Sequence, residues 1–150
     1  MTTEIRRLAS GDEEAIQAAG RCFDHPVKPE WAQRFLAAQG HHIFIGYSDG
    51  VPAGFVTGIE MTHPDKGTEM FLYELSVDER FRRMGIGSSL VSALADLAHQ
   101  RGCYGMWVLT DDENEAAVAT YRSAGGVTST ANRMVEWQFE PAPGATSSRL

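Results

Sequence analysis

Three arginines and two glycines lie close together in one short stretch of the chain, between residues 80 and 88. The core of this stretch reads Arg82-Arg83-Met84-Gly85-Ile86-Gly87-Ser88. Because glycine has no Cβ, the main chain can pass close to a ligand at such positions. If a helix begins here, the unpaired N–H groups of Gly85, Gly87, Ser88 and Ser89 point outwards and favour an anion. With the arginines adding positive charge, the stretch has the chemistry needed to hold a pyrophosphate group.

Two other kinds of phosphate-binding loop do not fit these residues. A dinucleotide-binding fingerprint requires a third glycine three positions after the second, where this chain has Leu90. A P-loop requires Gly-Lys-Ser or Gly-Lys-Thr, and no lysine follows Lys66. The pattern that remains is Arg-x-x-Gly-x-Gly, at Arg82, Gly85 and Gly87. On its own, this pattern is equally compatible with a turn that only caps a helix.

The elements that would position this turn can be recognised in the flanking residues. Residues 71–77 are almost all apolar or aromatic, which is typical of a strand covered on both faces. After the turn, apolar residues recur at helical spacing at Ile86, Leu90, Leu94 and Leu97. We therefore expect a buried strand, a glycine turn and an amphipathic helix, in that order.

Glu74 is the only side chain between Met70 and Val77 that is charged at neutral pH. A carboxylate inside an apolar strand is costly unless it is paired or reaches water, which favours a role as general base or as ligand of an ammonium group. The pKa of an unperturbed glutamate is about 4.3, so a base at neutral pH needs a pKa raised by burial, or a water that relays the proton. A structural ion pair with one of the arginines is the alternative.

A second motif follows downstream, on a helix expected at residues 115–124. Asn114, Ala117, Tyr121 and Gly125 fit the spacing Asn-x-x-Ala-x-x-x-Tyr-x-x-x-Gly. The two motifs, in this order, resemble those of the GNAT superfamily of acyltransferases, and the resemblance covers roughly residues 3–139. Within the superfamily, the segments FLYELSV, RRMGIG, AAVATYRSAGG and MVEWQFEP look most like the aminoglycoside 3-N-acetyltransferases.

The resemblance implies acetyl-CoA as cofactor. In this family the glycine turn binds the pyrophosphate, and the fourth strand, which splays from the fifth, pairs with the pantetheine arm. The cofactor-binding residues that it implies here are Leu75, Ser76, Val77, Arg82, Arg83, Met84, Gly85, Ile86, Gly87, Ser88, Asn114, Ala117 and Tyr121. A phenol has a pKa of about 10 and is protonated at neutral pH, so Tyr121 would donate the proton to the leaving thiol. Because Tyr121 shares an apolar helix face with Ala117 and Val118, a role in core packing is the alternative.

The acceptor is expected to be a small cationic amine. Glu74, Asp111, Asp112 and Glu136 would bind it, although the last three can equally be solvated surface charges. The prediction is transfer of an acetyl group from acetyl-CoA to the 3-amino group of an aminoglycoside antibiotic, with Glu74 as base and Tyr121 as acid. The alternatives are acetylation of a polyamine, an amino-acid derivative or a protein N-terminus, and a non-catalytic acyl-CoA-binding module.

Composition and charge limit the other classes of function. Hydrophobic residues make up 43% of the chain and charged residues 22%, which is ordinary for a soluble globular protein, and no apolar run approaches membrane-spanning length. The net charge of -7 argues against nucleic acid and mildly for a cationic partner. Cys22 and Cys103 are interpreted as reduced thiols of a cytoplasmic protein, and no His, Cys or Asp cluster has metal-ligand spacing. Dimers are common in the family, so a homodimer is left open.

The expected fold class is α/β (α+β), with a single GNAT domain over residues 1–140 and a disordered tail at residues 141–150. The pattern along the chain predicts a mixed sheet of about seven strands flanked by about four helices. The last two strands are expected near residues 127–130 and at residues 134–139.

Overall fold

The computed structural model describes residues 2–140, and these contain one mixed sheet in the order β1-β2-β3-β4-β5. Each of the first four strands is antiparallel to its neighbour: β1 (Thr3–Arg7), β2 (His41–Ser48), β3 (Val51–His63) and β4 (Gly67–Val77). The short strand β5 (Met106–Trp107) is parallel to β4. The predicted fold class, α/β with a mixed sheet, is confirmed.

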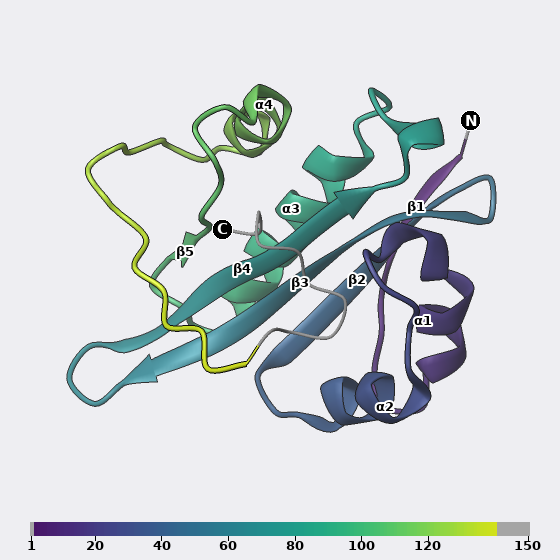
Figure 1. The fold of residues 1–150 in the computed structure, drawn as a ribbon, viewed down its shortest axis with the longest axis horizontal. Helices are drawn as coiled ribbons and strands as arrows, with labels where there is room; N and C mark the ends of the chain where they lie inside the picture. The colour runs from purple at the N-terminus through teal and green to yellow at the C-terminus, as the bar shows by residue number, and fades with distance from the viewer. Residues whose placement is uncertain (1, 141–150) are drawn as a thin grey trace.

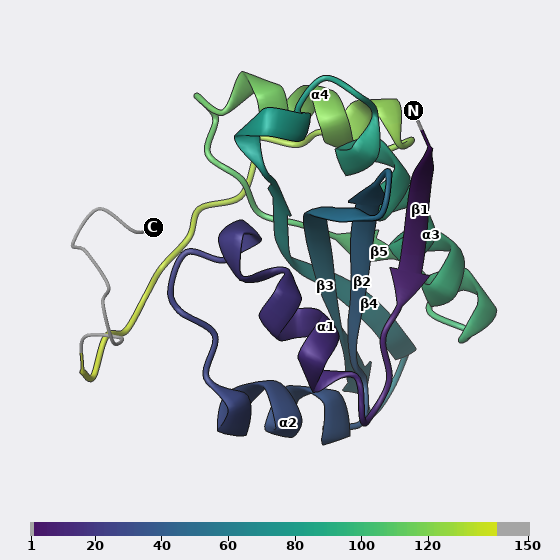
Figure 2. The ribbon, with the colours of Figure 1, turned by 90° about the vertical axis from the view of Figure 1, so that its right-hand side faces the viewer.

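Helices cover both faces of this sheet (Figures 1 and 2). The helix α1 (Glu13–Ala18), the 3-10 turn η1 (Gly20–Cys22) and the helix α2 (Pro29–Ala37) lie on one face, over β2 and β3. The long helix α3 (Ile86–Gln100) crosses the other face. The 3-10 turn η2 (Glu79–Phe81) connects β4 to the glycine turn, and α4 (Glu115–Ser123) packs beside α3.

Two hydrophobic clusters, one on each face, hold the layers together. On the α3 face, Ile86, Leu90 and Leu94 pack against buried residues that include Val56 and Leu72, as the helical spacing predicts. On the other face, the cluster includes residues of α1 and α2 packed on β2 and on Phe55 of β3. Within residues 71–77 only Leu72 is buried and Tyr73 is exposed, so the prediction that this strand is covered on both faces is only partly right.

The two C-terminal strands predicted near residues 127–130 and at residues 134–139 are not formed, and the sheet has five strands rather than about seven. The alternation of Val135, Trp137 and Phe139 with polar residues indicates a strand, but a strand also needs a neighbouring edge for its main-chain groups. β5 offers an edge only two residues long. Residues 127–138 therefore run without strand pairing, and Trp137 and Phe139 are 74% and 92% exposed. The predicted tail at residues 141–150 lies outside the described residues.

A buried histidine joins the ends of β1, β2 and β3. Arg7 Nη2 lies 3.2 Å from His42 Nδ1, and His42 Nε2 lies 2.7 Å from Glu60 Oε2. Because a guanidinium group can only donate, Nδ1 accepts and Nε2–H donates to the carboxylate, so His42 is neutral. Arg101 Nε also donates to Glu60, at 2.8 Å. Burial lowers the pKa of His42, and Arg7 and Arg101 act in the same direction against the raising effect of Glu60.

This arrangement predicts a loss of stability on mild acidification. In the unfolded chain His42 takes up a proton near its ordinary pKa of about 6.5, whereas the folded protein resists that proton to a lower pH. The free energy of unfolding should therefore fall as the pH drops below about 6.5, and the fall should end below the depressed folded pKa. Urea unfolding at several pH values between 7 and 5 would measure this change.

The matched variants are His42→Gln and His99→Gln, the second at an exposed position on α3. His42→Gln should flatten the pH dependence, and His99→Gln should retain it. Glu60, whose pKa is lowered by His42 and Arg101, loses its contribution only below about 4.5, outside this window. Equal slopes in wild type and His42→Gln would contradict the assignment.

Candidate active site

The sheet opens between β4 and β5. The two strands pair only at Met70 with Met106 and at Phe71 with Trp107, whereas β4 continues to Val77. After Trp107 the chain leaves the sheet and leads to α4. Within residues 2–140, no strand therefore pairs with the outer edge of β4 from Leu72 to Val77. This opening has one wall of strand main chain, the outer edge of β4.

A β-bulge in β4 determines which side chains lie beside this opening. Thr57 pairs with Glu74 and Gly58 with Leu72, so Tyr73 is the extra residue of the bulge. Residues directly opposite each other point to the same face, and Thr57 and Ile59 are two apart on β3. Glu74, opposite Thr57, and Phe71, opposite Ile59, therefore share one face of the sheet.

That face is the one covered in part by α1 and α2. The hydroxyl of Ser76 donates to the carbonyl of Cys22 in η1 at 2.7 Å, while Leu75 and Val77 pack on the α3 side. Alternation thus places Glu74 on the same side as Ser76, and the main-chain N–H of Glu74 donates to Thr57 Oγ1 at 3.1 Å. The side chain of Ser76, a residue of the predicted cofactor-binding set, fastens η1 to β4.

The glycine turn lies at the end of β4 and opens α3. Gly85 is the N-cap in the left-handed region, with φ 79°, and no side chain caps the helix. The first N–H groups of α3, those of Ile86, Gly87 and Ser88, are left without an intrahelical partner. The N–H of Ser89, predicted to be unpaired, instead donates to the carbonyl of Gly85 at 3.0 Å.

The three arginines near the turn have different environments. Arg80 is paired with Asp78 at 2.8 Å, and this guanidinium lowers the pKa of Asp78 to about 2. Arg82 Nε donates to the carbonyl of Val77 at 3.2 Å. Arg83 is exposed and has no hydrogen bond or ion pair with the part of the chain that is described. Arg83 is therefore the arginine best placed to pair with an anion at the turn.

The second glycine of the motif has a packing role. A Cβ on Gly87 would lie 3.2 Å from Thr120 Cγ2 of α4, whereas a Cβ on Gly85 would meet no atom within 4 Å. Ser123 Oγ of α4 also donates to Ser88 Oγ at 2.9 Å. Gly85 is thus required for its positive φ, and Gly87 allows α4 to approach the N-terminus of α3.

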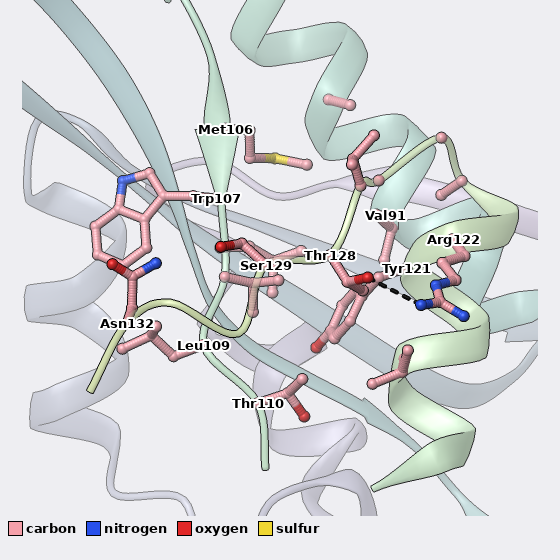
Figure 3. Close-up of a pocket in the computed structure, with 18 of the residues that line it drawn as sticks. Val91, Met106, Trp107, Leu109, Thr110, Tyr121, Arg122, Thr128, Ser129 and Asn132 are labelled. Atoms are coloured by element: carbon pink, nitrogen blue, oxygen red, sulfur yellow. Dashed lines mark hydrogen bonds between the residues drawn. The ribbon is translucent and has the colours of Figure 1, made fainter. Parts of the chain in front are cut away.

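A pocket of about 960 Å³ lies between β5, α4 and the segment after α4 (Figure 3). Tyr121 projects into it from α4, and the sequence-predicted residues Asp111 and Asp112 also line it. Burial raises the pKa of Tyr121, so its phenol stays protonated at neutral pH. The lining includes Leu72 and Val91 from the α3 face and Trp107, which pairs with Phe71, so the pocket lies at the opening between β4 and β5.

The site is thus built from a glycine turn at a helix N-terminus, an open strand edge and a half-buried tyrosine. A family model described as "Acetyltransferase (GNAT) family" matches residues 11–125 of the chain. The chain belongs to this family.

Two named relatives match parts of this chain at 30% and 34% sequence identity. The mycothiol acetyltransferase of Salinispora arenicola (strain CNS-205) is 30% identical over 135 residues, which are 83% of this chain and 44% of that protein. The [ribosomal protein bS18]-alanine N-acetyltransferase of Escherichia coli (strain K12) is 34% identical over 98 residues, 63% of each protein. The chain therefore spans about half the length of the curated relatives that it matches.

Solved structures show the same fold. An aminoglycoside acetyltransferase from an uncultured soil metagenomic sample, in complex with sisomicin, superposes with a TM-score of 0.79 at 21% sequence identity. The match covers 93% of this chain and 97% of that one. At this level of identity, the likeness establishes the fold alone.

Two further residues predicted for the site, Asn114 and Glu136, lie in different surroundings. Asn114 is the N-cap of α4, and its side-chain oxygen accepts from the N–H of Ala117 at 3.1 Å. Its side-chain oxygen thus serves the helix, and its amide nitrogen has no hydrogen-bond partner within residues 2–140. Glu136 lies exposed in the unpaired C-terminal segment and does not line the pocket with Asp111 and Asp112.

Several residues beside the opening of this GNAT fold were not predicted. Phe71 and Trp107 pack with ring centroids 4.5 Å apart, and Phe71 and Tyr73 with centroids 5.6 Å apart. Tyr73 is 53% exposed and Trp107 40% exposed. In the sequence these aromatic residues resemble core positions of a buried strand. Only the register with β3 and the divergence of β5 reveal that they face outwards.

Residues 2–140 contain neither a helix long and apolar enough to cross a membrane nor a group of three or more His, Cys, Asp and Glu placed to hold a metal ion.

Proposed function

We propose that this protein is an acetyl-CoA-dependent N-acetyltransferase that acetylates the 3-amino group of an aminoglycoside-type antibiotic. The observation that carries the proposal is the opening between β4 and β5, which has the glycine turn at one end. Tyr121 lies on one side of this opening and Glu74 faces the other. A donor and an acceptor can therefore approach each other from opposite faces of the sheet.

The residues of the turn fit the phosphate end of acetyl-CoA. Unpaired N–H groups at the start of α3 and the exposed guanidinium of Arg83 suit a pyrophosphate. The open edge of β4 near Leu75 and Val77 has main-chain groups suited to the amides of a pantetheine arm. Membership of the GNAT family supports this cofactor. When bound, acetyl-CoA supplies an acetyl group activated as a thioester.

Tyr121 and Glu74 would handle the two protons of the reaction. The raised pKa keeps the Tyr121 phenol protonated, so that it can donate to the departing thiolate. Glu74 would accept the proton of the acceptor ammonium, directly or through a water. Glu74 is half-buried on the face of β4 that also carries Phe71 and Ser76, and a partly buried carboxylate supports a role beyond solubility.

The aminoglycoside acceptor is supported by the acidic net charge and by the segments that resemble the 3-N-acetyltransferases. Asp111 and Asp112 both line the pocket and are exposed, and there they would attract a polycation. A second candidate acceptor is the N-terminus of a protein. The observation that favours it is the 34% identity with an enzyme named for acetylating ribosomal protein bS18.

The test is thiol release from acetyl-CoA with gentamicin-type aminoglycosides, spermidine and a short peptide with N-terminal alanine. Gentamicin-type substrates should turn over fastest, and mass spectrometry should locate the acetyl group on the 3-amino position. Activity should fall as ionic strength rises, because attraction between exposed charges is screened. Turnover of the peptide or spermidine alone would reject the aminoglycoside and keep the acetyltransferase. No turnover, with intact CoA binding, would indicate a non-catalytic module.

A further inference from the structure

An aromatic platform lies at the acceptor side of the opening and has no part in the reaction described above. It consists of Phe71 and Tyr73 on β4 and Trp107 on β5. Phe71 lies in the middle, 4.5 Å from Trp107 and 5.6 Å from Tyr73 between ring centroids. Tyr73 and Trp107 are among the most exposed large aromatic side chains of the sheet. On this face α1 and α2 pack over β2 and β3, and the segment after α4 lines a pocket together with Trp107 (Figure 3).

The platform is held in place by its neighbours. Trp107 is in register with Phe71 across the last paired position of β4 and β5, and Glu69 lines the same pocket as Trp107. Glu69 is fixed in turn by His63 at 2.5 Å and by the hydroxyl of Tyr104. Tyr73 is directed outwards because it is the extra residue of the bulge. Exposed aromatic rings that are fixed in this way are preorganised for a ligand rather than merely unburied.

Charge and shape together indicate what this platform binds. Glu74 is the next residue after Tyr73 and shares the face of Phe71, so the platform and a carboxylate lie on the same face of β4. An aromatic face attracts a cation, and it also packs against flat apolar surface. A linear amine carries positive charge but presents little flat apolar surface. A six-membered ring that carries amino groups presents both at once, an apolar ring face to the platform and an ammonium group to Glu74.

We propose that the platform of Phe71, Tyr73 and Trp107 is the acceptor subsite for a ring-borne amine, such as the aminocyclitol or amino-sugar ring of an aminoglycoside. This inference rests on the proposed function, because an acceptor subsite contributes to catalysis only if the protein is an acetyltransferase. It adds that one ring, rather than the whole polycation, is the recognised unit. The acceptor is therefore selected by the ring that carries the reacting amine, and not by its total charge.

The test compares two diamines of equal charge, cis-1,3-diaminocyclohexane and linear 1,5-diaminopentane, by calorimetry in the presence of CoA. The cyclic diamine should bind about tenfold more tightly. Tyr73→Leu should abolish this preference, and Tyr73→Phe, which keeps the ring and removes the hydroxyl, should retain it. Equal affinity for the two diamines, no binding of either, or an unchanged preference in Tyr73→Leu would overturn the proposal.

Turnover then separates this inference from the proposed function. With a reactive cyclic amine, Tyr73→Leu should raise KM about tenfold and leave kcat and the affinity for acetyl-CoA unchanged. A loss of kcat without a change in KM would overturn the platform. If cyclic amines bind preferentially but no amine is acetylated, the platform stands and the enzymatic function fails. If amines are acetylated without preference for a ring, the function stands and the platform is wrong.

Discussion

Replacing Tyr121 by Phe is expected to lower kcat about 100-fold, the low end of the effect of a positioned general acid. The substitution removes only the hydroxyl, so the ring still packs with the α3 cluster and the fold should persist. The affinity for acetyl-CoA should also persist, because the glycine turn is untouched. Since burial raises the pKa of Tyr121, the wild-type donor stays protonated throughout the neutral range, and kcat should not fall until the pH exceeds about 10.

The matched control is Tyr47→Phe, which removes a hydroxyl from a buried tyrosine in the cluster on the opposite face. Tyr47→Phe should leave kcat within about twofold of wild type, as expected when a tyrosine only packs. Pre-steady-state measurement of thiol release would separate the chemical step from product release. Similar kcat values in wild type and Tyr121→Phe would assign Tyr121 to the core.

The second large effect is expected at the glycine turn, where Gly85→Val should abolish acetyl-CoA binding. The cause is the backbone conformation: φ of 79° disfavours a β-branched residue, and the chain escapes the strain by shifting the N–H groups at the start of α3. The new Cβ has open space in the unliganded protein, so the fold should survive. On the ligand side of the turn, the side chain would also block close approach of a phosphate.

Gly102→Val provides the control. Gly102 has φ of 80°, a Cβ there would also meet no atom within 4 Å, and it lies just past the other end of α3. The two variants should therefore lose similar amounts of thermal stability, while only Gly85→Val loses affinity for acetyl-CoA by calorimetry. Unchanged affinity in a folded Gly85→Val protein would refute the cofactor assignment. An equal loss of affinity in Gly102→Val would attribute the effect to strain alone.

Features set by neighbouring residues were predictable from the sequence. The spacing of Ile86, Leu90 and Leu94 predicts α3, because helical periodicity depends only on residues within a few turns. The same holds for the αL glycine at the start of α3 and for α4 after Asn114. In each case the residues that specify the element also form it.

Features that depend on pairing between distant residues were not predictable. The bulge at Tyr73 exists only in register with Thr57 and Gly58, so the facing of Tyr73 and Glu74 cannot be read from β4 alone. The role of Gly87 depends on Thr120, and the hydroxyl of Ser76 is used by Cys22, far away in sequence. The prediction of two C-terminal strands fails for the same reason. Alternation of apolar and polar residues specifies which face of a strand is buried, but not the edge with which the strand pairs.

An unpaired strand edge is also a template on which a strand of another molecule can add, and so it promotes aggregation. β4 presents such an edge from Leu72 to Val77 within the described chain, in a segment of high β-propensity. Proteins protect exposed edges by placing a charge in the strand, because a second chain would have to bury that charge. Glu74 lies in the middle of this edge. The carboxylate proposed as base therefore also opposes self-association, and neutralising it would affect solubility as well as chemistry.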